Sequence, residues 1–202
     1  MSTELYFIYD SHCPWSYATT QVVNALHQAF PKMTLNLLHC AHYIGKDGAS
    51  AEQVSAVTDN SDVPVSKGYI SAISQAKDSI KTANFMSWLQ DKQPEKQLDV
   101  LNALQHAHFV DGNPLNDKRD FKSIIERFKL SPSNKVFKAE LSIDAEQALN
   151  DICEIQQIIG TQHFPALIMV VDDNAIFIDH SQHLSHPKSV VEAVKQEIAA
   201  LK

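Results

Sequence analysis

The chain has little cysteine, and its cysteines stand far apart. Only 3 of the 202 residues are cysteine, namely Cys13, Cys40 and Cys153. Small domains that rely on disulfides carry cysteines densely, because the bridges make up for a hydrophobic core that is too small. A sparse, odd-numbered set favours free thiols in a reducing compartment over a disulfide framework.

Glycine and proline are also scarce, with 5 and 8 residues. Disordered and fibrous chains are rich in these two residues, so neither class fits. Hydrophobic residues make up 44% of the chain and charged residues 20%, which is typical of a globular protein. The length predicts a single domain with a sizeable core.

Basic clusters and long apolar runs are absent. The chain has 17 basic and 24 acidic residues, and its formal net charge is −7. Nucleic acid and anionic lipid are bound by basic patches, so we expect neither as a partner. No stretch approaches the ~20 apolar residues of a membrane span. The apolar run from Leu5 to Tyr9 is too short for the core of a signal peptide, so we expect a cytoplasmic protein that does not contact membranes.

The first part of the chain has the pattern strand, helix, strand. Apolar residues 4–9 predict a buried strand, and Pro14 suits the first turn of a helix, where its missing N–H costs nothing. Apolar residues at helical spacing continue to Phe30, and residues 33–38 predict a second strand. The polar and small residues of 43–62 predict a long loop.

The middle of the chain has a helical period nearly throughout. The expected helices cover about 70–88, 98–104, 121–128 and 145–159, the last closed by Gly160.

The strand pattern returns near the end of the chain. Residues 166–171 and 175–178 predict two strands of a hairpin, and a last helix starts near Pro187. The order β-α-β, helical block, β-β-α predicts an α/β domain in which the helical block is an insertion.

The sequence Ser-His-Cys-Pro-Trp-Ser spans residues 11–16, between the first expected strand and helix. A thiol at Cys13 would lie where the first N–H groups of the helix lack partners, and these donors and the helix dipole favour thiolate over thiol. His12 could supply a proton carrier, and the Ser16 hydroxyl could donate to the thiolate. The motif therefore predicts a nucleophilic cysteine near neutral pH.

A second feature, His163-Phe164-Pro165, directly precedes the hairpin. Proline is tolerated at the first residue of a strand. The sequence alone leaves open whether its peptide bond is cis.

Together these features resemble the DsbA-like branch of the thioredoxin superfamily, and most closely its cytosolic, FrnE-like disulfide oxidoreductases. The resemblance rests on Cys-Pro-Trp-x between a strand and a helix, a helical insertion, and x-Phe-Pro before a hairpin and a last helix. The stretch from Leu101 to Gly112 and the approach from Ile159 to Pro165 add to it. The resemblance covers essentially the whole chain.

The resemblance implies a single domain over residues 1–202. Its thioredoxin-like part is formed by residues 1–62 and 161–202, and the helical insertion covers about 63–160.

The resemblance also implies the roles of particular residues. Cys13 is the expected nucleophile, and Pro165 is expected to be a cis-proline beside it. The Phe164 backbone is expected to pair with an extended peptide or with glutathione, as an added strand does. Pro14, Trp15 and His163 complete the expected substrate-binding set, in which Trp15 lies at the rim and His163 replaces a small residue.

The chain departs from this family at Ser16, which replaces the second cysteine of Cys-x-x-Cys. Without that thiol, a mixed disulfide on Cys13 must be released by glutathione or another external thiol. Cys40 and Cys153 could also resolve it, although nothing in the sequence places either near Cys13. We expect no tightly bound cofactor, glutathione as a co-substrate, and a protein, peptide or glutathione disulfide as the substrate.

Each site residue also has a purely structural interpretation. Cys13 could be a buried inert thiol and Ser16 an ordinary residue of the first helical turn. His12 could be a solvated loop histidine, and Trp15 and Phe164 could be ordinary core residues. The histidines within 39–42 and 180–186 lack the paired spacing of a zinc site, so no metal is expected.

Three functions follow from these observations. The first is a monothiol thiol–disulfide oxidoreductase that uses Cys13 and glutathione. The second is a glutathione-dependent transferase or isomerase, similar to the kappa-class transferases and the 2-hydroxychromene-2-carboxylate isomerases, which act on small organic molecules. The third is a peptide-binding relative without catalysis. The oligomeric state, monomer or homodimer, stays open.

Overall fold

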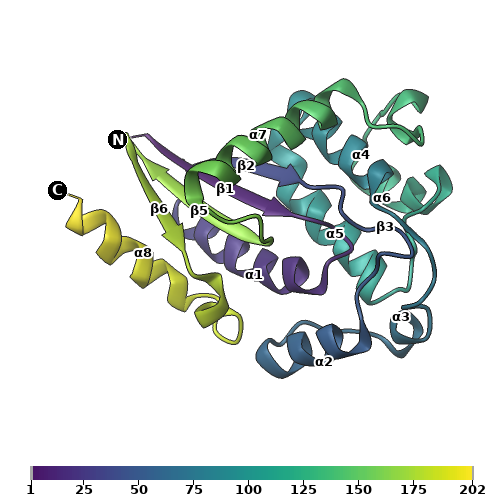
Figure 1. The fold of residues 1–202 in the computed structure, drawn as a ribbon. Helices are drawn as coiled ribbons and strands as arrows, with labels where there is room; N and C mark the ends of the chain where they lie inside the picture. The colour runs from purple at the N-terminus through teal and green to yellow at the C-terminus, as the bar shows by residue number, and fades with distance from the viewer. Residues whose placement is uncertain (1, 202) are drawn as a thin grey trace.

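The fold is built on a central four-stranded sheet (Figure 1). The computed structural model describes residues 2–201. The strand order is β2-β1-β5-β6, in which β1 runs parallel to β2 and antiparallel to β5, and β6 is antiparallel to β5. The strands are β1 (Thr3–Tyr9), β2 (Thr34–His39), β5 (Ala166–Val171) and β6 (Asn174–Ile178).

Strand β1 is central because its side chains are apolar on both faces. Leu5, Phe7 and Tyr9 point into the larger core cluster, and Ile8 points into a second cluster on the other face. All four are fully buried, as expected for a strand that is covered on both sides. The predicted strand 4–9 is therefore confirmed.

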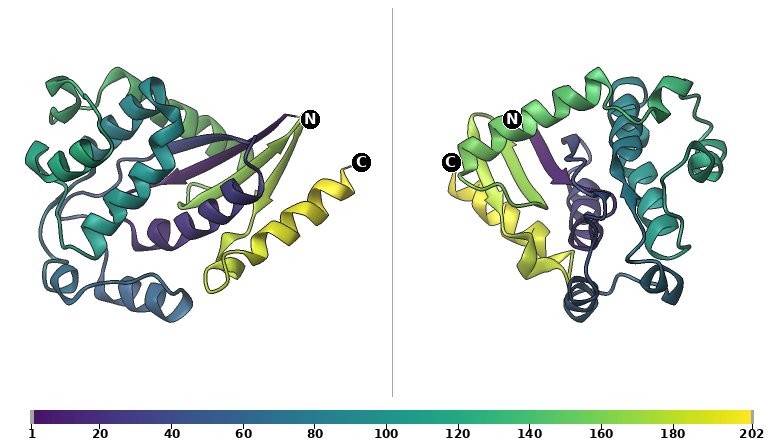
Figure 2. Two further views of the ribbon diagram at one scale, coloured as in Figure 1. Left: turned by 180° about the vertical axis from the view of Figure 1, so that it is seen from behind. Right: turned by 45° about the vertical axis from the view of Figure 1, so that its right-hand side comes forward.

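Helices cover both faces of this sheet (Figure 2). Helices α1 (Pro14–Ala29) and α8 (Ser189–Ala200) lie side by side on one face, and α7 (Ile143–Ile159) lies on the other. The sheet is thus the middle layer of three.

The segment between β2 and β5 is mostly helical. It contains α2 (Ala51–Asn60), α3 (Lys67–Ser71), α4 (Ser79–Lys92), α5 (Gln97–Phe109), α6 (Lys122–Arg127) and α7, together with a small sheet of β3 (Ile44–Gly45) and β4 (Lys77–Asp78). Helix α7 was predicted nearly residue for residue. It ends at Gly160, whose φ of 69° is left-handed, a conformation that glycine adopts without steric cost.

The predicted loop over 43–62 is wrong, because this stretch contains α2. Helix α2 begins with a capping box, in which the Ser50 side chain accepts from the Gln53 N–H and the Gln53 side chain accepts from the Ser50 N–H. Only Val54 and Val57 of this helix are buried. The apolar stripe was too thin to reveal the helix by its period.

The single helix predicted from about 70 to 88 is also wrong. Helix α3 ends at Ser71, and α4 begins only at Ser79. The backbone between them pairs as β4 with β3, and the Asp78 side chain then caps α4 by accepting from the Ile80 N–H at 3.2 Å. The apolar residues of α3 and α4 together follow a helical spacing, so the sequence suggested one continuous helix.

The remaining sequence-predicted elements agree with the structure. The hairpin of β5 and β6, the final helix, and helices near 98–104 and 121–128 are present. No helix within residues 2–201 is both long enough and apolar enough to cross a bilayer.

We expect Phe7→Ala to lower the free energy of unfolding by about 3–5 kcal/mol, because it opens a cavity in the centre of the core. The same truncation at Phe177, whose side chain is 54% exposed on β6, should cost less than about 1 kcal/mol. Urea denaturation of both variants and the wild type measures the difference. Equal losses at the two positions would contradict the assigned layers.

Candidate active site

Cys13 lies at the junction between β1 and α1, as predicted. It is the N-cap residue of α1, and its Sγ accepts a hydrogen bond from the Ser16 N–H at 3.4 Å. Pro14 occupies the first helical turn, where no N–H is required. The sulfur thus accepts a hydrogen bond from one of the backbone N–H groups that have no partner within the helix.

The Cys13 side chain is almost completely buried, with 3% of the residue exposed. Burial raises the pKa of the thiol because it disfavours the charged form. Hydrogen bonds from the Ser16 N–H, the Ser16 hydroxyl and the Tyr43 hydroxyl lower it by less. The expectation that the helix start lowers this pKa on balance is therefore wrong for the resting structure.

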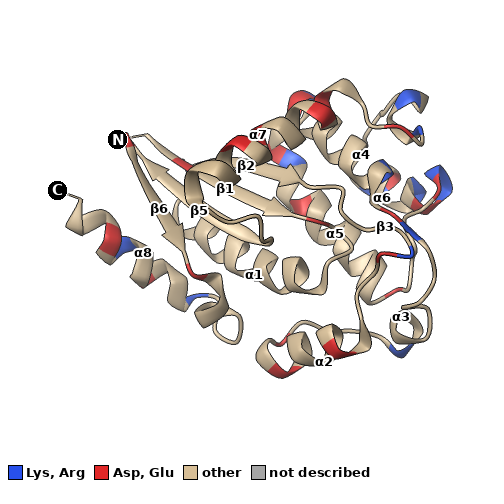
Figure 3. Cartoon of the chain, viewed as in Figure 1, with Lys and Arg blue, Asp and Glu red and all other residues tan. Residues whose placement is uncertain are grey.

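The donors around the sulfur are neutral. Figure 3 shows that α1 carries no Lys, Arg, Asp or Glu along its length. Helix α1 therefore offers no lysine or arginine to stabilise a thiolate at Cys13. The negative charge of that thiolate depends on hydroxyl and N–H donors.

Ser16 is fully buried beside Cys13. Its Oγ accepts from the Asp10 N–H at 3.3 Å, and its hydroxyl is one of the donors to the Cys13 sulfur. The hydrogen bond that the motif spacing predicted is thus present, and its catalytic importance stays a prediction.

Beneath the motif, the fully buried Asp10 carboxylate binds two loops together. Its Oδ1 accepts from the His12 N–H at 2.8 Å. Its Oδ2 accepts from the N–H groups of His42 at 2.7 Å and Tyr43 at 3.1 Å. Asp10 therefore fixes the segment after β2 against the loop that carries Cys13.

Asp10 is ionised at neutral pH although it is buried. Burial by itself would raise the pKa of Asp10, but His39, His12 and the hydrogen bonds from His12 outweigh it and hold this pKa well below its usual range. Burial lowers the pKa of His39 to about 4. At neutral pH the His39 ring is thus uncharged, while three N–H groups still donate to the carboxylate.

His12 is not the solvated histidine of the structural interpretation. Its residue is 1% exposed, and its Nδ1 lies 3.2 Å from Ser11 Oγ and 3.5 Å from Asp10 Oδ1. Its Nε2 is hydrogen-bonded to the Pro114 carbonyl at 3.1 Å. The ring thus serves the network under the motif, and the Cys13 sulfur is not among its hydrogen-bond partners.

The peptide bond between Phe164 and Pro165 is cis. It directly precedes β5, whose Ala166 pairs with Ile8 near the end of β1. The Phe164 ring contacts His42 with 5.0 Å between the ring centroids and Tyr43 with 6.3 Å. The segment His163-Phe164-Pro165 thus packs against the same segment after β2 that Asp10 binds.

The other residues of the motifs lie around this arrangement. Trp15 is half-buried against the main core, and His163 is exposed. Cys40 follows β2 directly and is half-buried, whereas Cys153 is exposed on α7. The Cys40 N–H donates to the Tyr9 carbonyl at 2.8 Å, so the fold brings Cys40 to the end of β1, nearer to the motif than the sequence indicated.

Asp10 and Tyr43 were missed as site residues by the sequence analysis. Asp10 looked like a turn residue after a strand, and Tyr43 fell at the start of a predicted loop. An aspartate three residues before the cysteine was the one available signal, and its burial could not be read from it.

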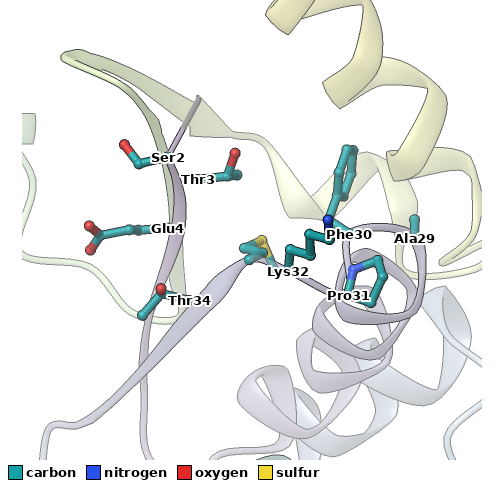
Figure 4. A pocket seen from close by; sticks show the side chains of 9 residues that line it. Ser2, Thr3, Glu4, Ala29, Phe30, Pro31, Lys32 and Thr34 are labelled. Atoms are coloured by element: carbon teal, nitrogen blue, oxygen red, sulfur yellow. The ribbon is translucent and has the colours of Figure 1, made fainter.

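A pocket of about 460 Å³ lies at the opposite end of the sheet (Figure 4). It is lined by residues at the starts of β1 and β2 and by the end of α1, whereas Cys13 follows the last residue of β1. Its lining includes none of the motif residues. Within residues 2–201, no three His, Cys, Asp or Glu side chains gather in an arrangement that could hold a metal ion.

Asp10→Asn should lower the free energy of unfolding at pH 7 by about 3 kcal/mol, because an amide replaces a buried carboxylate among its donors. The pKa of Asp10 is depressed in the folded protein. Its contribution is therefore complete above the reference value of 3.8 and is lost as the pH falls below it. Urea titrations from pH 7 to pH 2 should show a constant difference between the two proteins down to about pH 4 and a shrinking difference below it. A difference that stays the same from about pH 4 to pH 2 would contradict an ionised Asp10.

Comparison with known proteins gives structural neighbours only. No protein-family model and no curated protein sequence matches the chain. The cytosolic disulfide reductase DsbM from Pseudomonas aeruginosa superposes with a TM-score of 0.83 at 15% identity, covering 98% of this chain and 99% of that chain. The structure of DsbM with GSH gives a TM-score of 0.80 at 15% identity, covering 97% and 99%.

A third solved structure agrees with these two. It is a candidate protein disulfide isomerase from Nitrosomonas europaea, with a TM-score of 0.77 and 16% identity over 100% of this chain and 99% of that chain. At such low identity the likeness shows the fold. The chain therefore has the α/β, DsbA-like thioredoxin fold that its sequence predicted.

Proposed function

We propose that this protein is a monothiol thiol–disulfide oxidoreductase that uses Cys13 as its nucleophile and glutathione as its reductant. One observation carries the proposal. The Cys13 sulfur lies at the start of α1, receives hydrogen bonds from Ser16 and Tyr43, and shares its end of the sheet with the cis Phe164–Pro165 bond. The structural neighbours that are disulfide reductases support the same reaction class.

In the first step, the Cys13 thiolate attacks one sulfur of a substrate disulfide. A bond forms between Cys13 Sγ and that sulfur, the substrate S–S bond breaks, and the other sulfur leaves as a thiolate that takes a proton from solvent. Because the resting thiol is buried, neighbouring groups must move before the substrate sulfur reaches it.

In the second step, a glutathione thiolate attacks the mixed disulfide. The Cys13 thiolate is the leaving group, and the substrate sulfur departs bonded to glutathione. When the bound group is itself glutathione, the product is glutathione disulfide, and the net reaction converts the mixed disulfide and one added glutathione into the substrate thiol and glutathione disulfide. Ser16 has no thiol with which to perform this release, so the proposal assigns it to an external thiol.

The edge of the loop before β5 is the proposed substrate contact. A peptide or glutathione would pair with the Phe164 backbone as an added strand, with Pro14, Trp15 and His163 around it. A neighbouring structure that contains GSH supports glutathione as the co-substrate. A reducing compartment such as the cytoplasm suits free thiols and this reductant.

Cys13→Ala should abolish glutathione-dependent reduction of a small mixed disulfide while leaving the fold intact. Cys40→Ala and Cys153→Ala are the matched controls and should retain most of the activity, because neither thiol is the proposed nucleophile. A coupled assay of glutathione disulfide formation, with circular dichroism for folding, measures both properties. Unchanged turnover in Cys13→Ala would refute the proposal, and full activity in Cys13→Ser would favour a transferase in which a hydroxyl activates glutathione.

Ser16→Cys should convert the site from a monothiol to a dithiol. The Ser16 N–H already lies 3.4 Å from Cys13 Sγ, so a thiol at position 16 starts close to its partner. We expect this variant to release a mixed disulfide without added glutathione, by forming a disulfide between residues 13 and 16. Mass spectrometry of the protein after one turnover detects that bond. A variant that stays trapped as the mixed disulfide would contradict the geometry.

A further inference from the structure

The segment after β2 brings a phenol to the sulfur of Cys13. Tyr43 is 7% exposed, and its hydroxyl hydrogen-bonds the Cys13 side chain. No motif in the sequence indicated this contact, because Tyr43 is 30 positions from Cys13 and lies outside every predicted helix and strand.

Backbone contacts on both sides fix the position of Tyr43. Its N–H donates to Asp10 Oδ2 at 3.1 Å, and its carbonyl accepts from the Ser79 N–H at 3.0 Å. The neighbouring His42 N–H donates to the same Asp10 oxygen at 2.7 Å. The residue is therefore held by its backbone from two sides, by the loop after β1 and by the start of α4.

Ring contacts fix the direction of the side chain. The Tyr43 ring meets the His42 ring edge-on with 5.4 Å between centroids, and it meets the Phe164 ring edge-on with 6.3 Å. A ring packed between its own loop and the loop before Pro165 has little rotational freedom. The hydroxyl that interacts with the Cys13 side chain is thus carried on a restrained ring and needs little reorganisation during a reaction.

Tyr43 is a hydrogen-bond donor over the whole physiological pH range. Burial raises the pKa of Tyr43 well above its usual range, and the charge of Cys13 and the hydrogen bond to it act in the same direction. A phenol that keeps its proton can donate to a thiolate without neutralising it. The same donation lowers the pKa of Cys13 against the effect of burial.

We propose that Tyr43 is a catalytic residue of the thiol exchange, whose hydroxyl stabilises the Cys13 sulfur each time that sulfur carries negative charge, and that Asp10 positions it. This inference rests on the proposed function. The sulfur is charged twice in the cycle, as the attacking thiolate in the first step and as the leaving thiolate in the second. One donor at a fixed position serves both steps, and no proton is transferred to or from Tyr43.

Other groups also act on Cys13 and must be separated from Tyr43 in any pH profile. Asp10 raises the pKa of Cys13 from its own loop. Cys40, after β2, and Tyr69, on α3, are both affected by charge on Cys13. Replacing only the Tyr43 hydroxyl leaves all these groups unchanged, so Tyr43→Phe isolates the proposed interaction.

The test is the rate of Cys13 alkylation by iodoacetamide between pH 6 and pH 11, followed by mass spectrometry of the Cys13 peptide. Tyr43→Phe should shift the profile to higher pH and slow alkylation at pH 7.5 about tenfold, because a hydrogen bond to a charged sulfur is lost. The matched control is Tyr9→Phe, which also removes a buried hydroxyl, one that has no hydrogen-bond partner. We expect its profile to coincide with that of the wild type.

A second measurement follows the leaving-group step. Each protein is first converted to the Cys13–glutathione mixed disulfide with glutathione disulfide, and release is then timed after adding glutathione. Release should be about tenfold slower in Tyr43→Phe than in Tyr9→Phe, since the leaving thiolate loses its donor.

The outcomes separate this inference from the proposed function. Coinciding alkylation profiles for Tyr43→Phe, Tyr9→Phe and wild type would overturn the role of Tyr43, whatever the activity assays show. A shifted profile with unchanged release would overturn its catalytic role in the second step. Turnover that survives in Cys13→Ala would instead reject the redox function. The alkylation profile requires no substrate, so it tests the role of Tyr43 independently of that result.

Discussion

The arrangement around Cys13 depends on one buried carboxylate and the N–H groups that surround it. Asp10 accepts from its own loop and from the segment after β2, so the two halves of the β-α-β unit are joined directly beneath the sulfur. A buried charge without such donors would be too costly to keep, and donors without the charge would be left unpaired. The loop that carries Cys13 and the segment after β2 therefore depend on each other for their positions, because one supplies the carboxylate and the other supplies N–H donors.

The sulfur itself is subject to opposing effects. Burial of Cys13 favours the neutral thiol, whereas the start of α1, Ser16 and Tyr43 favour the thiolate. A thiol kept neutral at rest is protected from indiscriminate oxidation, and preformed donors stabilise the charge once a substrate is close. The absence of charged side chains along α1 makes these neutral donors more important than they are beside a lysine or arginine.

Sequence patterns predicted the layers of the fold better than the details of the site. Continuous apolar strands and the glycine after α7 carry their signal locally, as does the strand–motif–helix order that places Cys13. Helix α2 escaped because it buries only two residues, and the break before Ser79 escaped because a cap and a short strand pair replace a visible loop. Tyr43 and the burial of Asp10 depend on contacts between distant segments, which no periodicity encodes.

The order of the strands also affects how the protein is made. Cys13 and Asp10 belong to the first strand–helix unit, but β5, the strand beside β1, lies in the last fifth of the chain. During synthesis the amino-terminal part emerges first, and the sheet cannot close until β5 and β6 follow. Until β5 arrives, one edge of β1 has no strand partner, so the backbone N–H and carbonyl groups of that edge stay open for most of translation.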